Sequence, residues 1–355
     1  YFDLNKYINP LLESSNKTLN LLGRLCRYLI SSGGSRLPDW RRIPWISPAF
    51  KTGIRLVEEL DIDLIYSSSS PPASSIIARK IAKRRNVRWI AEFRDAWTLN
   101  PYIPRSKLGH MLEYKYEQYV LSSAEALVTV SEPIAKELSE MHNKPCHVIF
   151  NAYDKQDYVQ REKVDQDKFT IVHTGSIYPG KRDPQSLLEA LADMKTKDPS
   201  IAELVEVNLY GQRQERLLAP KISILGIDDM VNFKGLVSKS ESIKTQKKAA
   251  LLLLLTWNNP IAEGTVTGKL FEYIAASRPI LAISYPGVIK EVLESNNMGK
   301  VINDSSKIQL FLESAIAKWK SGDMSLGGYN TNVEARQKFS WDHQVSKLNS
   351  IFENK

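Results

Sequence analysis

The sequence predicts an α/β protein with two domains, each a parallel β-sheet covered by helices on both faces. Three observations support this prediction. Short apolar segments alternate with longer amphipathic ones, which is the order of strands and helices in parallel sheets. The segment ALLLLLT (250–256) is continuously apolar, as expected for a strand buried on both faces. The length of 355 residues is enough for two domains, each with its own core.

Ten short segments rich in aliphatic and β-branched residues predict strands. In chain order they are residues 63–68, 88–93, 126–131, 147–152, 169–175, 205–211, 231–235, 250–256, 279–284 and 299–303. Amphipathic segments between them, such as SEPIAKELSEM and DPQSLLEALADM, predict helices. Residues 1–50 have no clear strand and are expected to be helical or irregular.

A polar and charged segment, residues 154–168, predicts the linker between the two domains. The sequence therefore predicts an N-terminal domain over residues 1–160 and a C-terminal domain over residues 161–332. The last stretch, residues 333–355, has the pattern of one more amphipathic helix.

Composition limits the class of protein. A hydrophobic content of 43% with 25% charged residues is typical of a globular protein. The net charge of +8 is spread along the chain, which favours anionic ligands or an anionic membrane surface over a dedicated nucleic-acid protein. The longest apolar run is about half of what a membrane span needs. The two cysteines, Cys26 and Cys146, form no disulfide framework or metal cluster and favour a reducing compartment.

The segment EGTVTGKLFEYIAASRPILA (263–282) follows the strand of continuous apolar residues. Gly264 and Gly268 allow close approach of a ligand to the backbone. Thr267 is a candidate N-cap for a helix that begins near Gly268, and such a helix start is an anion site. Lys269 would lie in the first turn, where the helix dipole disfavours a cation. A bound phosphate would offset this effect, so the sequence predicts a phosphate site.

Glu272 is three residues after Lys269 and shares its helix face. A carboxylate can accept two hydroxyl hydrogen bonds, which suits a ribose. The alternative interpretation is an ordinary ion pair between Lys269 and Glu272 on the helix surface. A P-loop is excluded, because three residues instead of four separate Gly264 from Gly268 and because Leu270 replaces the Ser or Thr that binds magnesium.

A second segment, HTGSIYPGKRDPQSLLEAL (173–191), also predicts a strand, a glycine-containing loop and a helix. Lys181 and Arg182 lie in the loop, Asp183 is expected to cap the helix, and Pro184 is expected at its first position. Two basic loops at two strand ends of one sheet could bind one diphosphate.

The order and spacing of these segments resemble the retaining glycosyltransferases of family 4, which have the GT-B architecture and belong to the glycosyl transferases group 1. The resemblance runs from about residue 40 to the C-terminus. It also rests on SSSSPPASS (67–75), EFRDAW (92–97), VTVSEPIAKEL (128–138) and VIFNAYD (148–154). It implies two Rossmann-like domains facing a cleft, with residues 333–355 packing back on the N-terminal domain. The family's opening strand and glycine-rich loop have no counterpart here, so we expect a truncated or abbreviated N-terminal domain.

The resemblance also implies roles for individual residues. Arg182 and Lys269 would contact the diphosphate, Glu272 the ribose hydroxyls and Glu263 the donor sugar. Asp95 could orient an acceptor hydroxyl, or it could merely pair with Arg94. The implied catalytic residues are Glu263, Lys269, Arg182 and Asp95. The implied donor site is Gly175, Lys181, Arg182, Gly211, Gly235, Leu236, Val237, Gly264, Thr265, Val266, Thr267, Lys269, Leu270 and Glu272. The implied acceptor side is Ser69, Ser70, Pro71, Arg94 and Asp95.

The resemblance implies transfer of a sugar from a nucleoside diphosphate sugar to a hydroxyl with retention, in the assembly of a bacterial surface polysaccharide or glycolipid. It implies no metal and no cofactor. A sugar-nucleotide epimerase, a phosphorylase and a non-catalytic nucleotide-sugar-binding protein are the alternatives. A dinucleotide dehydrogenase is disfavoured because no G-x-G-x-x-G follows a strand.

A basic cluster, residues 79–88, contains six Lys and Arg residues. It predicts either a solvated helix face or a contact with an anionic membrane surface. Without interleaved aromatic residues it does not predict nucleic-acid binding. The expected location is cytoplasmic, with peripheral contact at the inner face of the membrane.

Overall fold

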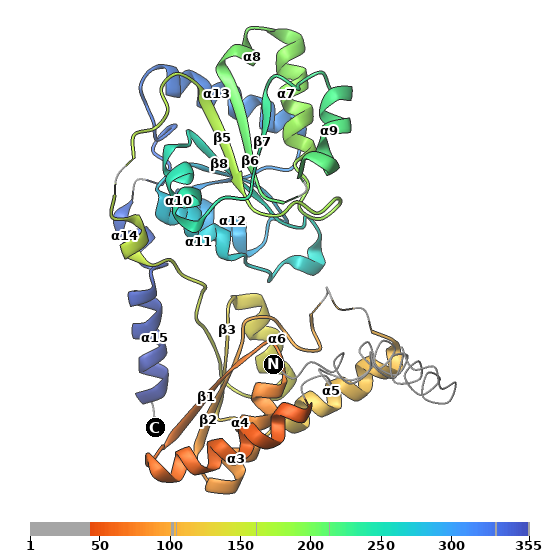
Figure 1. The fold of residues 1–355 in the computed structure, drawn as a ribbon, viewed down its shortest axis with the longest axis vertical. Coiled ribbons are helices and arrows are strands. Elements are labelled where there is room, and N and C mark those ends of the chain that lie inside the picture. The colour runs from red at the N-terminus through yellow and green to blue at the C-terminus, as the bar shows by residue number, and fades with distance from the viewer. Residues whose placement is uncertain are drawn as a thin grey trace, which may run out of the picture. The chain divides into compact units, whose positions relative to one another are not determined.

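The computed structural model describes residues 43–100, 103, 105–160, 162–212, 214–330 and 332–353. The predictions made for residues 1–42, Cys26 included, lie outside these ranges. The chain divides into two compact units, Tyr1–Ile149 and Phe150–Lys355, and each holds one parallel sheet with helices packed on it (Figure 1). The predicted fold class, two α/β domains with parallel sheets, is confirmed.

The described part of the first unit contains a four-stranded sheet in the order β1-β2-β3-β4, and all its strand pairs are parallel. The strands are β1 (Leu64–Ser69), β2 (Arg88–Phe93), β3 (Ala126–Thr129) and β4 (Cys146–Val148). The helices are α3 (Ile43–Glu59), α4 (Ala73–Arg85), α5 (Lys107–Leu121) and α6 (Glu132–His142). Each of α4, α5 and α6 joins two neighbouring strands, which is the crossover that parallel pairing requires.

The core of the first unit forms where β2 and β3 meet these three helices. Trp89, Phe93 and Leu127 are fully buried on the strands. Leu121 of α5 and Leu138 of α6 pack in the same cluster. The carboxyl ends of β1 and β2 carry the residues expected on the acceptor side.

The second unit contains a six-stranded parallel sheet in the order β10-β9-β8-β5-β6-β7. The strands are β5 (Phe169–Thr174), β6 (Val205–Tyr210), β7 (Val231–Gly235), β8 (Leu251–Leu255), β9 (Ile280–Ile283) and β10 (Gly299–Val301). The helices are α7 (Gln185–Lys197), α8 (Ile201–Leu204), α9 (Gln214–Ile224), α10 (Lys239–Lys248), α11 (Gly268–Ala276), α12 (Val288–Ser295), α13 (Ser305–Lys320), α14 (Val333–Gln337) and α15 (Trp341–Glu353). The strand order reverses between β5 and β8, and ligands of doubly wound sheets bind at such a reversal.

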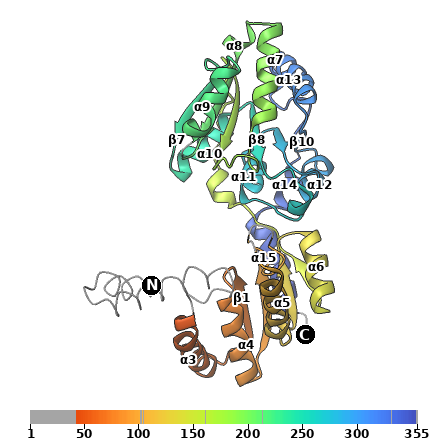
Figure 2. The same ribbon diagram turned by 90° about the vertical axis from the view of Figure 1, so that its right-hand side faces the viewer.

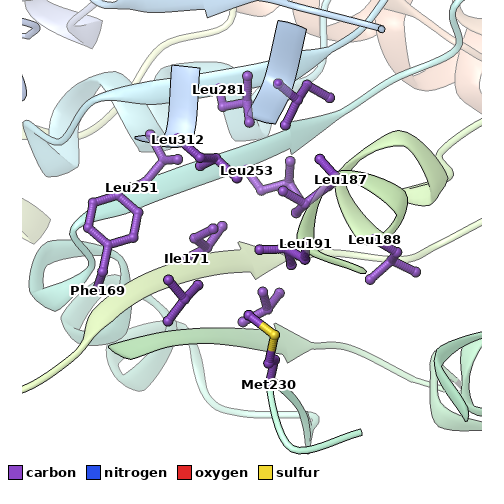
Figure 3. Close-up of a cluster of buried hydrophobic side chains, with 14 of the residues drawn as sticks. Phe169, Ile171, Leu187, Leu188, Leu191, Met230, Leu251, Leu253, Leu281 and Leu312 are labelled. Carbon is purple, nitrogen blue, oxygen red and sulfur yellow. The ribbon is translucent and has the colours of Figure 1, made fainter. Parts of the chain in front are cut away.

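Both faces of this sheet are buried, because alternate residues of a strand point to opposite sides. Phe169, Ile171 and Leu253 pack with α7, α9 and α13 on one side (Figure 3). Val172 and Leu252 pack with α11 and α12 on the other. Helices α7 and α13 lie side by side in both views (Figures 1 and 2). The continuous apolar sequence of β8 is thus explained.

All ten predicted strands are present, and nine of them have ends within two residues of the predicted ones. The exception is β4, which ends at Val148 because its partner β3 ends at Thr129. After β4 the backbone N–H of Phe150 donates instead to the side chain of Gln344 (2.9 Å).

The segment predicted as the linker between the domains, residues 154–168, is ordered and packs on the second unit. Its first turn is a 3-10 helix, η2 (Lys155–Tyr158). Val164 is buried in the core of the second unit, and the N–H of Asp165 donates to the carbonyl of Lys248 (3.1 Å). The segment is held by backbone hydrogen bonds and by one buried apolar side chain, that of Val164. Because these contacts require few apolar residues, the composition of the segment is that of a linker.

The prediction of one helix over residues 333–355 is wrong, since α14 and α15 are separate. Phe339, between them, is buried in the second unit's core. The backbone there pairs with Tyr153, which donates to Phe339 (3.1 Å) and accepts from Trp341 (3.0 Å). These contacts replace helical hydrogen bonds at the break.

Candidate functional site

A cavity of about 340 Å³ lies in the second unit at the carboxyl ends of β5, β6 and β7 and beside the start of α11. We call it the switch-point cavity, because β5 and the helix that follows β8 border the reversal in strand order. It is lined by Thr174, Gly175, Ser176, Tyr210, Gly211, Gln212, Gly235, Leu236, Val237, Ser238, Lys239, Ser242, Lys269 and Glu272. Seven of the predicted donor-site residues are in this set.

Helix α11 begins at Gly268, as the sequence predicts. Thr267 is its N-cap, with an extended backbone (φ −82°, ψ 144°), and its hydroxyl accepts from the N–H of Lys269 (3.4 Å). The first-turn N–H groups of a helix carry a partial positive charge. Lys269 adds a full positive charge in this turn and lines the cavity. The arrangement is suited to an anion.

Glu272 is held by two hydrogen bonds to the same oxygen. Lys269 Nζ lies 2.7 Å from Oε2, and Gln246 Nε2 lies 3.2 Å from it. The ion pair expected from the alternative interpretation is therefore present, but at the wall of a cavity. In the part of the chain that the structure describes, Oε1 has no hydrogen-bond partner. That oxygen can accept from the hydroxyls of a ligand.

Gln246 of α10 fixes this carboxylate from below the surface. Its side chain is fully buried, and Nε2 also lies 3.0 Å from Oγ1 of Thr174. The backbone N–H of Thr174 donates to the hydroxyl of Tyr273 (2.8 Å), which is itself fully buried. Burial raises the pKa of Tyr273 to about 12, so this hydroxyl is neutral. The network joins the end of β5 to α10 and α11.

The loops that follow β5, β6 and β7 are joined through their backbones. The N–H of Gly175 donates to the carbonyl of Tyr210, and the N–H of Gly211 donates to that of Gly235 (both 2.9 Å). A Cβ at Gly211 would lie 2.3 Å from the carbonyl oxygen of Gly175, so this close approach requires glycine. Gly235 has φ +68°, a conformation that glycine adopts without strain. These loops thus present backbone to the cavity.

The basic loop before α7 turns back on itself. Tyr178 and Arg182 form an antiparallel bridge around Gly180, whose φ is +72°. Lys181 Nζ lies 4.5 Å from the ring centroid of Trp257, which is separated from the end of β8 by Thr256. The Arg182 guanidinium lies 5.4 Å from the ring centroid of Tyr178. Both cations lie over aromatic rings, and neither lines the cavity.

The cap of α7 differs slightly from the prediction. The helix begins at Gln185, with Pro184 in the cap position. Asp183 still satisfies the helix start, because its Oδ1 accepts from the N–H of Gln185 (3.1 Å).

His173 is the penultimate residue of β5 and is neutral. Its Nδ1–H donates to the carbonyl of Leu253 (2.9 Å). Burial, together with the nearby charges of Lys269 and Arg182, lowers its pKa to about 4. These two cations therefore both act on the end of β5, and their binding of a diphosphate stays a prediction.

The loop between β8 and α11 uses some of the predicted residues for packing. Val266 and Leu270 are buried in the core. The N–H of Thr265 donates to the carbonyl of Ala262 (2.9 Å) and is not available to a ligand. Glu263 is exposed at the end of η3 (Pro260–Ala262), where it lies against Gly287.

The predicted acceptor-side residues lie at the carboxyl ends of β1 and β2 in the first unit. Ser69 is 1% exposed, and its hydroxyl lies 2.9 Å from that of Ser75. Ser70 is exposed, and the peptide bonds on both sides of it are cis. Arg94 pairs with the buried Glu92 (3.1 Å), while the neighbouring Asp95 is exposed. Ser69 therefore shapes the loop, and Asp95 is open to solvent.

Half of the basic cluster at residues 79–88 is used within the first unit. Arg79 is 8% exposed, donates to the carbonyl of Tyr119 (3.1 Å) and stacks on its ring (3.8 Å). Arg85 pairs with Glu58, and Arg88 pairs with Glu125 (2.7 Å). The exposed members of the cluster are Lys80, Lys83 and Arg84.

Two further properties concern only the residues that the structure describes. No helix among them is long and apolar enough to cross a bilayer. No three of their His, Cys, Asp and Glu side chains are grouped so that they could hold a metal ion. The absence of a metal requirement stays a prediction.

Sequence reasoning missed the residues that support Glu272. Thr174 directly precedes the predicted Gly175, and Gln246 is four residues after Ser242 on the same buried helix face. Two polar residues at this spacing on a buried face are a weak signal of a shared polar contact. The contact of Trp257 with Lys181 was also missed, because nothing in the sequence pattern pairs the two residues.

Two family models match the sequence, one over each half. Residues 21–157 match the family described as Glycosyltransferase Family 4, and residues 168–317 match the family described as Glycosyl transferases group 1. With the two parallel-sheet domains, these matches place the chain among the glycosyltransferases of GT-B architecture. No curated protein sequence matches the chain.

Several solved structures share the fold. Alr3699/HepE from Anabaena, in complex with UDP, has a TM-score of 0.66 at 15% identity, covering 90% of this chain and 85% of that one. Sucrose-phosphate synthase (tll1590) from Thermosynechococcus elongatus has a TM-score of 0.62 at 13% identity, covering 89% and 79%. A putative UDP-N-acetylglucosamine 2-epimerase from Listeria monocytogenes has a TM-score of 0.52 at 12% identity, covering 87% and 80%. At such identities the likeness concerns the fold alone.

Proposed function

We propose that this glycosyltransferase moves a sugar from a nucleoside diphosphate sugar to a hydroxyl acceptor, with retention of the anomeric configuration. The observation that carries the proposal is the pairing of Lys269 and Glu272 at the wall of the switch-point cavity. The Lys269 ammonium is suited to a phosphate and the Glu272 carboxylate to a ribose. The two groups are adjacent, as the phosphate and the ribose of a nucleotide are. The Anabaena protein of the same fold has been solved with UDP and with UDP-glucose.

The nucleotide would occupy the cavity with its base against the backbone of residues 235–237. Glu272 Oε1 would accept from the ribose hydroxyls, because Oε2 is already bound by Lys269 and Gln246. The diphosphate would lie at the first turn of α11. Lys269 there and Arg182 of the basic loop would neutralise it.

In the reaction, the bond between the anomeric carbon and the diphosphate oxygen breaks and negative charge develops on the leaving group. Preorganised cations and N–H donors at that place stabilise the transition state. Lys269, Arg182 and the start of α11 would supply them. The acceptor oxygen forms its bond on the face that the diphosphate leaves, and its proton passes to an oxygen of the leaving phosphate. Glu263 would bind the donor sugar, and Asp95 would orient the acceptor hydroxyl.

Hydrolysis of the donor in the absence of acceptor tests this function. The full chain is incubated with UDP-, GDP- and ADP-glucose, and the products are followed by NMR. Free α-glucose and nucleoside diphosphate support a retaining transferase that uses water as a slow acceptor. An altered sugar still joined to its nucleotide would show an epimerase. Binding without turnover would show a non-catalytic protein.

We also propose a peripheral membrane contact through Lys80, Lys83 and Arg84, the exposed part of the basic cluster. Each basic residue near an anionic surface contributes about 1 kcal/mol. Co-sedimentation with anionic liposomes at low salt supports the contact. It should be lost when the three residues are replaced by Gln, and retention of binding by that variant contradicts the proposal.

A further inference from the structure

A second cavity, of about 330 Å³, lies in the second unit between β10 and α13. We call it the edge cavity, because β10 is an edge strand of the sheet. It shares no lining residue with the switch-point cavity. Helix α13 contributes Lys307, Phe311, Ser314 and Lys318, whose spacing of three or four residues places them on one face of the helix.

Part of the lining of the edge cavity is apolar. Ile302, Phe311, Leu326 and Tyr329 contribute to it, and the rings of Phe311 and Tyr329 are 6.3 Å apart. Leu310 also lines the cavity and is 66% exposed. Apolar surface left in contact with water favours a ligand that covers it.

Three lysines surround this apolar lining, and no acidic residue lines the cavity. Lys300 and Lys307 have no ion pair or side-chain hydrogen bond among the described residues. Lys318 donates one long bond to the carbonyl of Leu326 (3.4 Å). Its neighbour Asp323, whose carboxylate accepts from Ser325 and Gly327, also interacts with the charge of Lys318 and offsets part of it. Three like charges around one concave surface create a positive potential that attracts an anion.

We propose that the edge cavity is a second ligand site, which binds a small amphiphilic anion. Such a ligand has one phosphate, sulfate or carboxylate group and one aromatic or short aliphatic group. The anionic group would lie among the three ammonium groups, and the apolar group would lie against Phe311 and Tyr329. The site differs in chemistry from the switch-point cavity, which has a carboxylate for hydroxyls and glycine loops for a base.

Naphthyl phosphate is a suitable probe, because it joins an aromatic ring to one phosphate. Its binding to the full chain is measured by calorimetry at low salt, with naphthol and inorganic phosphate as probes of each half alone. We expect naphthyl phosphate to bind about tenfold more tightly than either of them. Equal affinity for naphthyl phosphate and naphthol would overturn the role of the lysines, and no binding would overturn the site.

Variants separate this site from the rest of the surface. The double variant Lys300→Gln/Lys307→Gln should weaken binding about tenfold or more, because it removes two charge-assisted contacts. Lys320→Gln, on the same helix but outside the cavity, is the matched control and should bind as the unaltered chain does. All three substituted residues are exposed, so the variants are expected to fold. Undiminished binding by the double variant overturns the proposal.

Competition locates the probe. Saturating nucleoside diphosphate should not displace naphthyl phosphate, and Glu272→Ala should not change its affinity. Displacement by the nucleotide, or loss of binding in Glu272→Ala, would place the probe in the switch-point cavity and contradict a second site. The proposal does not depend on the function proposed for the switch-point cavity.

Discussion

Nζ of Lys269 lies 2.7 Å from Oε2 of Glu272, so the cation expected to bind a phosphate is paired with the carboxylate expected to bind a ribose. Both side chains are about one-third exposed, and a pair at such exposure contributes little to stability, typically about 0–1 kcal/mol. The position of the pair at the cavity wall indicates a role in binding rather than in stability. The pair holds both groups in place before a ligand arrives.

Replacement of Lys269 by Ala should lower turnover by roughly 10²–10³, because it removes a charge that stabilises the leaving diphosphate. Steady-state kinetics with the preferred nucleotide sugar measure this loss. Lys248→Ala, an exposed lysine of α10 outside the cavity, is the matched control. Turnover of Lys269→Ala within threefold of the unaltered chain would contradict the phosphate role.

Arg182→Ala should have an effect of the same size on turnover, roughly 10²–10³. The guanidinium stacks on Tyr178 in the absence of ligand, so binding of the diphosphate should draw it away from that ring. Tyr178→Leu, which removes the ring and keeps the arginine, separates the two effects. An equal loss in both variants would show that the arginine acts only by holding the loop.

Gln246→Met should weaken nucleotide binding while it leaves stability nearly unchanged. The amide donates to Glu272 and Thr174, but its Oε1 is buried without a partner. Replacing a partly satisfied buried amide by an apolar side chain of similar size should change the unfolding free energy by less than about 1 kcal/mol. Calorimetry and urea unfolding measure the two quantities separately. A large loss of stability with unchanged affinity would show a purely structural role.

Protonation of His173 should make the protein less stable in mild acid. The pKa of this histidine is about 4 in the folded chain and 6.5 in its unperturbed state. Between these values the unfolded chain binds the additional proton, so stability is present above pH 6.5 and is lost as the pH falls toward 4. The loss is on the order of 3 kcal/mol. Urea unfolding at pH 7 and pH 5 tests it, and His173→Asn should remove most of the difference.

Leu253→Ala should destabilise the chain by about 2–5 kcal/mol, because it leaves a cavity in a core where the side chain is fully buried (Figure 3). Ile224→Ala, at a position that is 86% exposed, should change stability by less than about 0.5 kcal/mol. Chemical unfolding of both variants provides the comparison. Similar effects in the two would contradict the burial of Leu253 in the core of the second unit.

The strands were predictable because their signal is local. Each of the ten has a short apolar run, and the burial of β8 on both faces is visible in LLLLL alone. The start of α11 was predictable for the same reason, since Thr267 and Gly268 mark a helix N-terminus by themselves. What failed depends on distant contacts. Phe339 breaks the last helix because a core formed by other segments accepts it.

The site was predictable only in part, for a related reason. Lys269 and Glu272 lie on one helix, and their spacing of three residues predicts that they are neighbours. Gln246 supports Glu272 from another helix, and no pattern in the sequence joins them. In the basic cluster, the sequence predicted more exposure than the structure shows. Six charges indicated an exposed surface, but Arg79 is buried against Tyr119. Side-chain stacking of this kind leaves no mark in charge counts.

The most direct test of the account is calorimetric binding of UDP, GDP, ADP, CDP and TDP to the full chain in the absence of metal, with Glu272→Ala beside it. The account predicts that at least one nucleotide binds at micromolar strength and that Glu272→Ala loses this binding. Failure of all five nucleotides to bind, or undiminished binding by Glu272→Ala, would contradict the claim that the switch-point cavity is a nucleotide-sugar site.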